Sequence, residues 1–346
     1  MAPERLVDRN PRLSAGELAA RFSPPARFAE VRFETFVPNR EHPSQAEALG
    51  ELERFAASVV APAPSTGGWG IFRRRAAPPA EASTRPGRYL DGGFGVGKTH
   101  LLASLWHAAP PPKAYVTFEA LTAVIGFLGM AEAVRTFAGY RVLCIDEFEL
   151  DDVANTLLTV TFLRAIIPEG VKVATTSNSI PERLGEGRFN AEDFRREIAA
   201  ISEHFDALRI DGPDFRAASR PARTKALDEG AVQRLAGTSP NGVTLDAFPD
   251  LLAHLRRVHP VQFGALLDGA ETVLLTGMHP IENQGSALLF VQLVDELYDA
   301  EVTFGATGCA VTEVFPESYR HGGFRKKYGR CESRLSAMLA EADRRA

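Results

Sequence analysis

The chain has few cysteines and no pattern of cysteine or histidine that is typical of a metal site. Its three cysteines, Cys144, Cys309 and Cys331, are far apart in sequence, and no two of them form a C-x-x-C pair. None of the eight histidines belongs to an H-E-x-x-H motif or a comparable ligand spacing. The sequence therefore predicts neither a disulfide framework nor a structural metal, and it favours a reducing compartment.

Long hydrophobic runs and an excess of charge of one sign are also lacking. The most apolar helical candidate, residues 153–167, is interrupted by Asn155, several threonines and Arg164, so it is not typical of a membrane span. The first residues, Met-Ala-Pro-Glu-Arg, contain no apolar signal core, and we expect a cytoplasmic protein. The net charge of −5 argues against a protein whose whole surface binds nucleic acid, but it does not argue against a local basic patch.

The remaining composition is that of a globular protein. Hydrophobic residues make up 45% and charged residues 24% of the 346 positions. This length predicts more than one domain, or one domain with a large appendage.

A glycine-rich stretch at residues 88–99, Arg-Tyr-Leu-Asp-Gly-Gly-Phe-Gly-Val-Gly-Lys-Thr, has the spacing G-x-x-x-x-G-K-[ST] of a phosphate loop. Glycines let successive backbone N–H groups curl around a triphosphate, and the positive end of the following helix faces the same anion. An ordinary strand-to-helix turn is the alternative, but an apolar strand before the loop and an amphipathic helix after it favour nucleotide binding. The predicted ATP-binding residues are Gly92, Gly93, Phe94, Gly95, Val96, Gly97, Lys98 and Thr99. Lys98 would reach the β- and γ-phosphates, and Thr99 would offer its hydroxyl to Mg²⁺.

A second motif is Arg141-Val-Leu-Cys-Ile-Asp-Glu-Phe148. Its aspartate, Asp146, lies 48 residues after Lys98. Apolar residues that end in two carboxylates indicate a buried strand of the Walker B type. Asp146 would hold Mg²⁺, and Glu147 would be the catalytic residue that polarises the attacking water.

Two further catalytic candidates lie at the end of the next predicted strand, residues 171–178, and after it. Asn178 ends this strand, where it could orient the same water, because the carboxyl ends of parallel strands line one crevice. Its alternative role is to begin a turn before Pro181. Arg188 is the first candidate for a finger that completes the site of a neighbouring subunit, and an ordinary surface charge is the alternative.

These elements predict an α/β fold, with an AAA+ P-loop NTPase core around a parallel five-stranded sheet and a C-terminal α/β subdomain. The asparagine after the fourth strand favours the AAA+ branch over the RecA-like one.

Within the lead-in helix, Ser44-Gln-Ala-Glu47 is interpreted as a capping box. The predicted divisions are a flexible tail at 1–30, a lead-in helix with a Pro/Gly-rich linker at 31–87, the core at 88–212 and a lid-like subdomain at 213–346.

The motifs together resemble the ZapE family of bacterial cell-division ATPases, which also has mitochondrial members. Besides the two Walker segments, the resemblance rests on Pro43-Ser-Gln-Ala46, Thr176-Ser-Asn178, Leu293-Val-Asp-Glu-Leu-Tyr298 and Arg330-Cys-Glu-Ser-Arg-Leu335. It covers most of the chain, apart from the N-terminal tail and the linker at 61–87. The last two motifs are the most selective for this family.

The resemblance implies an ATP hydrolase, with Mg²⁺ as cofactor, that acts on the division machinery and engages FtsZ. It also implies peripheral association with the inner membrane. Two departures concern arginines: Leu288 and Leu289 replace a usual arginine pair, and the stretch ending in Arg188 differs from the family pattern. Arg330 or Arg334 could substitute as a nucleotide-sensing arginine. The AAA+ assignment further predicts a nucleotide-dependent homo-oligomer.

Two other functions remain open from the sequence. An AAA+ loader linked to DNA would use the basic segments 73–75 or 220–225 as contacts. A nucleotide-gated scaffold with little turnover would account for the loss of the paired arginines. A remodeller of a protein partner is the preferred interpretation.

Overall fold

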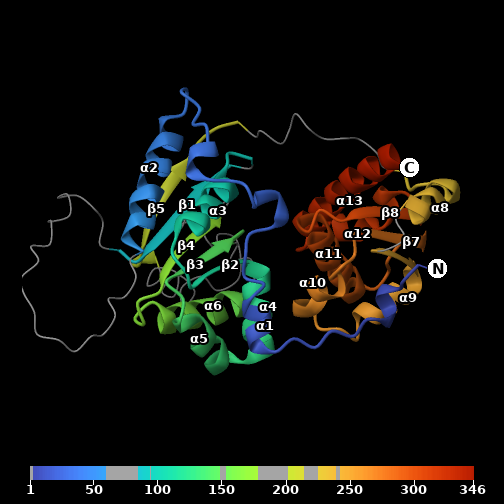
Figure 1. Ribbon diagram of the computed structural model, residues 1–346, viewed down its shortest axis with the longest axis horizontal. Coiled ribbons are helices and arrows are strands. Elements are labelled where there is room, and N and C mark those ends of the chain that lie inside the picture. Colours follow the sequence, from blue (N-terminus) through green and yellow to red (C-terminus); the bar gives the residue numbers. More distant parts are fainter. Residues whose placement is uncertain are drawn as a thin grey trace, which may run out of the picture. The chain divides into compact units, whose positions relative to one another are not determined.

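The computed structural model describes residues 3–59, 85–93, 95–148, 153–177, 202–213, 225–238 and 242–346. The chain divides into two compact units (Figure 1). We call the first the P-loop unit; it comprises Ala15–Pro24 and Phe28–Arg216. The second, the C-terminal unit, comprises Met1–Ser14, Pro25–Arg27 and Ala217–Ala346. The polypeptide therefore starts in the C-terminal unit and returns to it twice, which differs from the division predicted from the sequence.

The P-loop unit contains the predicted five-stranded parallel sheet, in the order β2-β3-β4-β1-β5. Its strands are β1 (Gly87–Gly92), β2 (Lys113–Thr117), β3 (Val142–Asp146), β4 (Lys172–Ser177) and β5 (Phe205–Ile210). Strand β4 lies between the strand that leads into the phosphate loop and the strand that ends in Asp146. Because all five strands run parallel, the phosphate loop and Asp146 lie at the same edge of the sheet.

Helices flank this sheet. They are α1 (Ala15–Ala19), α2 (Pro43–Ser58), α3 (Lys98–Ala108), α4 (Phe118–Leu128), α5 (Met130–Ala138) and α6 (Val153–Ile166). Helices α2 and α3 share one core cluster with side chains of β1, β2 and β3, including Leu52, Phe55, Leu101 and Tyr115. Helix α4 packs against β2 and β3, and α5 and α6 pack against each other, with Phe137 and Phe162 edge to face. The phosphate-loop helix is thereby anchored along its buried side.

The lead-in helix α2 is attached to the end of β5 rather than capped as predicted. The helix begins at Pro43, and its N-cap is His42, which makes no side-chain capping bond. The Ser44 hydroxyl instead accepts the N–H of Asp211 at 3.0 Å, and the buried Gln45 amide donates to the carbonyl of Asp211 at 2.9 Å. The predicted capping box is therefore wrong, because these side chains satisfy the backbone that follows β5.

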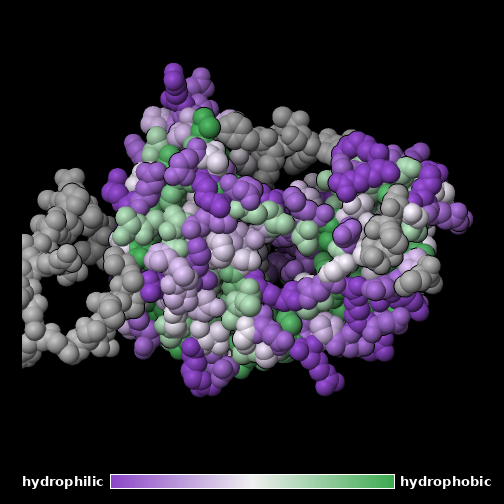
Figure 2. Space-filling view, viewed as in Figure 1, coloured by the Kyte–Doolittle hydropathy of each residue, from purple (hydrophilic) through white to green (hydrophobic). Residues whose placement is uncertain are grey.

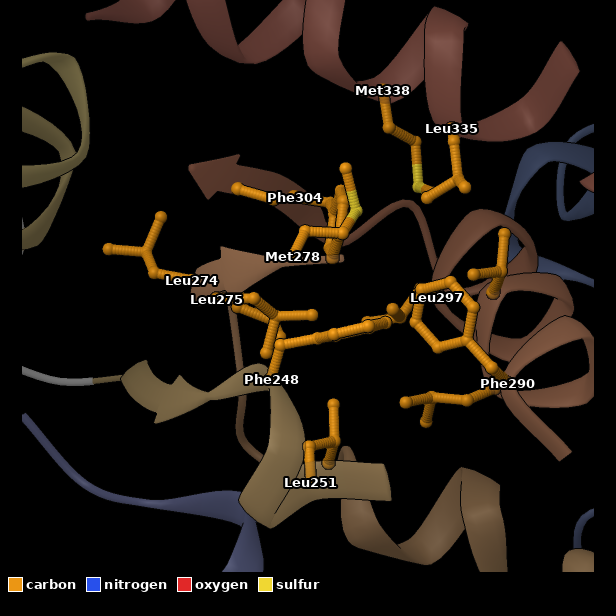
Figure 3. Close-up of a cluster of buried hydrophobic side chains, with 14 of the residues drawn as sticks. Phe248, Leu251, Leu274, Leu275, Met278, Phe290, Leu297, Phe304, Leu335 and Met338 are labelled. Carbon is orange, nitrogen blue, oxygen red and sulfur yellow. The ribbon is translucent and has the colours of Figure 1, made fainter. Parts of the chain in front are cut away.

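The C-terminal unit is a smaller α/β layer with a three-stranded parallel sheet in the order β6-β7-β8. Its strands are β6 (Val243–Ala247), β7 (Thr272–Met278) and β8 (Thr303–Gly308). Its helices are α8 (Glu229–Thr238), α9 (Phe248–Leu255), α10 (Phe263–Leu266), α11 (Gln284–Asp299), α12 (Glu317–Arg320) and α13 (Arg325–Arg345). Figure 3 shows the core where α9, α11 and α13 meet the sheet, with Phe248 and Phe290 edge to face. The predicted α/β subdomain is therefore present.

Residues 4–7 pack into this unit. Glu4 pairs with Thr244 as a parallel bridge at the free edge of β6, and Leu6 is fully buried. The buried carboxylate of Asp246 accepts the N–H groups of Leu6 at 2.9 Å and Val7 at 3.3 Å. The predicted flexible tail is wrong for this segment. The segment shows no hydrophobic periodicity, because it contributes an edge contact at Glu4 and a buried side chain at Leu6.

We expect Leu6→Ala to lower the free energy of unfolding of the C-terminal unit by about 2–5 kcal/mol, the usual cost of truncating a buried leucine to alanine. Segment-resolved hydrogen exchange should show faster exchange over β6 and α9. Val37→Ala is the control, since Val37 is 84% exposed and its truncation removes little packing. Equal protection in the two variants would contradict the packing of this segment.

The described residues include no single helix that is long and apolar enough to cross a membrane. The bent pair α4 and α5 passes the length and composition test when taken together, with 120° between the two helices. Figure 2 shows hydrophilic and apolar residues intermingled on the visible face.

Candidate nucleotide-binding site

The phosphate loop requires glycine at two positions for different steric reasons. Gly92 has a φ of 155°, and a Cβ there would lie 2.1 Å from the carbonyl oxygen of Ile210 on β5. Gly97 has a φ of 98°, and a Cβ there would lie 2.6 Å from the ring of Phe36. The loop is therefore enclosed between the end of β5 and the segment before α2, with no room for side chains at either point.

Helix α3 (Lys98–Ala108) begins directly after this loop. Its N-cap is Gly97, which has no side chain to cap the helix. The N–H groups of the first turn and the helix dipole consequently favour an anion at this position. Lys98 is buried, and its Nζ donates to the carbonyls of Gly92 at 2.8 Å and Gly93 at 2.5 Å. The ammonium group is thus already held at the loop.

The carboxylate of Asp146 is buried within the site. Oδ1 accepts hydrogen bonds from the hydroxyls of Thr99 at 3.2 Å and Thr176 at 2.5 Å, and Oδ2 accepts one from Tyr115 at 2.8 Å. Burial raises the pKa of this carboxyl, and the neighbouring charge of Glu147 raises it further. The hydrogen bonds from Thr176 and Tyr115 act in the opposite direction and lower the pKa, because they favour the ionised form.

These residues fit a magnesium nucleotide. Thr99 Oγ1 and Asp146 Oδ1 are adjacent oxygen atoms, the ligand type that Mg²⁺ prefers, and they lie beside the glycine loop and Lys98. The two oxygens come from the phosphate-loop helix and from β3, so the fold brings the two Walker segments together. The arrangement could bind a triphosphate together with its cation.

Glu147 leaves the strand in an unusual backbone conformation. Its φ is 54°, in the left-handed region that few non-glycine residues occupy. Thr176 holds this turn: its hydroxyl accepts the N–H of Glu147 at 3.0 Å, and its carbonyl accepts the N–H of Phe148 at 2.7 Å. Phe148 is buried against the rings of Tyr89 and Phe118. The backbone at Glu147 is therefore held by β4 and by the aromatic packing of the next residue.

The structure locates most of the residues that the sequence singled out. Gly92, Gly93, Gly95, Val96, Gly97, Lys98, Thr99, Asp146 and Glu147 are described, and the contacts above join the loop, the lysine and the acidic pair. Phe94, Asn178 and Arg188 lie outside the described residues. Their predicted roles stay predictions.

Arg330 and Arg334 are engaged within the C-terminal unit. Arg330 donates to Asp295 Oδ2 at 2.8 Å, Arg334 pairs with Asp295 Oδ1, and the Arg334 guanidinium also lies over the ring of Tyr298. The two motifs that were most selective for the family resemblance thus meet at one ion-pair cluster. In this arrangement both arginines bind a carboxylate of their own unit.

Sequence reasoning missed Tyr115, Thr176 and Phe36 as parts of the site. Thr176 stands two residues before Asn178, and its proximity to that candidate was the available signal. Tyr115 lies within a strand and Phe36 before a helix, where an aromatic side chain indicates only a core position. Phe36 packs edge to face with His100 on α3, whose Nε2 lies 2.9 Å from Thr35 Oγ1.

We expect Thr176→Val to lower turnover about 10-fold or more, because hydrogen bonds to charged groups contribute about 1.5–3 kcal/mol and this hydroxyl makes two bonds in the site. Thr176→Ser keeps the hydroxyl and should restore most of the activity. Phosphate release at saturating ATP measures both variants. Wild-type turnover in Thr176→Val would show that the hydroxyl does not hold Glu147 and Asp146.

Comparison with known proteins agrees with the geometry of the site. Residues 22–236 and 219–345 match the AFG1-like ATPase family. The chain is 26% identical over 353 residues to the cell division protein ZapE of Escherichia coli (strain K12), covering 86% of this chain and 91% of ZapE. An uncharacterized protein of Schizosaccharomyces pombe is 28% identical over 148 residues, which are 38% of this chain and 33% of that protein.

Solved structures are more distant. DnaI has a TM-score of 0.39 at 18% identity, covering 57% of this chain and 98% of that chain. AMPPCP-bound DnaA from Aquifex aeolicus has a TM-score of 0.37 at 12% identity, covering 61% of this chain and 60% of that chain. These scores are too low to carry an argument about function. The family match spans nearly the whole chain and includes both Walker segments, so the chain belongs to the AFG1-like ATPase family.

Proposed function

We propose that this ATPase binds Mg·ATP at the phosphate loop, hydrolyses it with Glu147 as the catalytic residue, and couples the cycle to remodelling of a protein partner. The observation that carries the catalytic part is the contact between Thr99 Oγ1 and Asp146 Oδ1 at 3.2 Å. This contact joins the phosphate-loop helix α3 to β3, and Glu147 directly follows β3.

The chain's own groups divide the work of binding. The backbone N–H groups of the loop and of the first turn of α3 would bind the phosphates. Lys98 would exchange its two carbonyl partners, Gly92 and Gly93, for phosphate oxygens. Thr99 and Asp146 would hold Mg²⁺, which supplies charge neutralisation when it is bound.

Glu147 would orient the attacking water and accept its proton. Its side chain is partly buried, and its backbone is held by Thr176, so a water bound to it has a defined direction. Asn178 would assist in placing the same water. Arg188 would complete the site of a neighbouring copy, which makes a nucleotide-dependent homo-oligomer part of the proposal.

The partner is proposed from the relative rather than from the site. The Escherichia coli relative is named a cell division protein, and the chain covers 91% of it. We therefore propose that the partner is a component of the division machinery, with FtsZ as the first candidate. We also propose that this protein associates peripherally with the membrane.

Phosphate release with ATP, with and without Mg²⁺, tests the catalytic part. We expect turnover that requires Mg²⁺ and is absent with EDTA. Tight ATP binding with no turnover, alone or after oligomerisation, would favour a nucleotide-gated scaffold and contradict the hydrolase.

Binding to purified FtsZ tests the partner separately. The variant Glu147→Gln, loaded with ATP, should retain FtsZ more strongly than the nucleotide-free protein does. Mass measurement of the same samples gives the oligomeric state. No FtsZ binding in either state would exclude this partner while leaving the ATPase assignment intact.

A further inference from the structure

We propose that Tyr115 is a positioning residue for the metal-binding carboxylate of Asp146. The proposal rests on the proposed function, because it assigns Tyr115 a role toward the cation that Asp146 would hold. The juxtaposition that carries it is a hydrogen bond of 2.8 Å from the Tyr115 hydroxyl to Asp146 Oδ2.

The sheet brings this phenol to the carboxylate. In the parallel register of β2 and β3, Tyr115 is opposite Cys144, and Thr117 is opposite Asp146. Tyr115 and Asp146 are thus diagonal neighbours, and an aromatic side chain is long enough to span a diagonal pair. Tyr115 is 3% exposed and belongs to the core cluster beneath α3, so its ring has little freedom to turn away.

The phenol divides the two oxygens of Asp146 between different tasks. Oδ2 accepts a hydrogen bond from the Tyr115 hydroxyl, while Oδ1 faces the hydroxyl of Thr99, the other candidate metal ligand. A carboxylate bonded in this way is held with Oδ1 toward the phosphate-loop helix. Groups that hydrogen-bond to a metal ligand orient it and tune its affinity in the same manner.

The neighbouring strands supply this support from both sides of β3. Tyr115 comes from β2, and Thr176 from β4 donates to Oδ1. Thr176 also holds the turn at Glu147, whereas the hydroxyl of Tyr115 contacts Asp146. Removal of the phenol should therefore affect the cation more than the catalytic turn, and this separates its role from that of Thr176.

The test is Tyr115→Phe, measured by the binding of Mn²⁺ as a spectroscopic substitute for Mg²⁺. Electron paramagnetic resonance with a non-hydrolysable ATP analogue gives the Mn²⁺ dissociation constant. We expect it to rise about 10- to 100-fold, the range for removal of a group that supports a metal ligand. The Mg²⁺ concentration for half-maximal turnover should rise in parallel, while turnover at saturating Mg²⁺ stays within about threefold of wild type, because Glu147 and Thr176 keep their positions.

Tyr140→Phe is the matched control, since it also removes a phenol hydroxyl from the P-loop unit. The Tyr140 hydroxyl contacts the carbonyl of Ala19. The Mn²⁺ affinity of Tyr140→Phe should equal that of wild type. Tyr115→Met, which also lacks a hydroxyl, should show the same loss of affinity as Tyr115→Phe. Thermal unfolding without metal confirms that each variant is folded, and Tyr115→Met serves if the phenylalanine variant is not.

An unchanged Mn²⁺ dissociation constant in folded Tyr115→Phe, or in folded Tyr115→Met where the phenylalanine variant does not fold, would overturn the proposal. These outcomes are distinct from a failure of the proposed function. If the proposed function is wrong, the wild-type protein itself would neither bind Mn²⁺ with the analogue nor hydrolyse ATP.

Discussion

Replacing Glu147 by glutamine should reduce ATP turnover by about 10²- to 10⁴-fold, the contribution typical of a positioned general base. The amide cannot accept the proton of the attacking water, but it occupies nearly the same volume. Thr176 bonds to the backbone N–H groups of Glu147 and Phe148, so the turn should survive the substitution. ATP binding, measured by anisotropy of a fluorescent analogue with Mg²⁺, should change by less than about threefold because none of the phosphate-binding groups is altered.

Glu132→Gln is the matched control for this prediction. Glu132 lies on α5 and forms an exposed pair with Arg135, so the same chemical change should leave turnover unaltered. Comparable turnover in Glu147→Gln and the control would remove Glu147 from the catalytic role. A loss of ATP binding equal to the loss of turnover would instead indicate that Glu147 supports the nucleotide site as a whole.

Replacing Lys98 by alanine should weaken ATP binding by about 100-fold or more, because charge-assisted hydrogen bonds contribute about 1.5–3 kcal/mol each and the lysine would contact two phosphates. The buried ammonium also bonds to the carbonyls of Gly92 and Gly93. Its removal therefore takes away both the phosphate contact and a brace of the loop. Isothermal titration with Mg·ATP measures the effect.

Lys172→Ala separates a local effect from a general one. Lys172 begins β4 at the opposite end of the strand from Ser177, and its Nζ donates to the carbonyl of Ser58 at 3.0 Å. The control thus removes a lysine that also bonds to a backbone carbonyl, but away from the phosphate loop. We expect wild-type ATP affinity in the control, and equal affinity in both variants would contradict the assignment of Lys98.

The ion-pair cluster of the C-terminal unit bears on the arginines that the sequence left open. Arg330 and Arg334 both bind Asp295, and Arg334 also covers Tyr298. A nucleotide-sensing role for either arginine would therefore require it to leave a carboxylate partner. The sequence separates the motifs by more than thirty residues, and only the packing of α11 against α13 brings them together.

Local sequence determined the phosphate loop and the acidic pair. Glycines at Gly92 and Gly97, a lysine and a threonine in sequence, and two carboxylates after an apolar strand define their chemistry by type and spacing. The alternation of strands and helices also determined the parallel sheet, because each parallel pair requires a crossover. These features depend on residues close together in the chain.

The tertiary structure decided what depends on distant residues. Tyr115 and Thr176 reach Asp146 because β2 and β4 flank β3, and Gln45 meets Asp211 because α2 returns to β5. Leu6 enters a core whose other members begin more than two hundred residues later. No local pattern records such contacts, since their energy comes from side chains that fold topology alone places within reach.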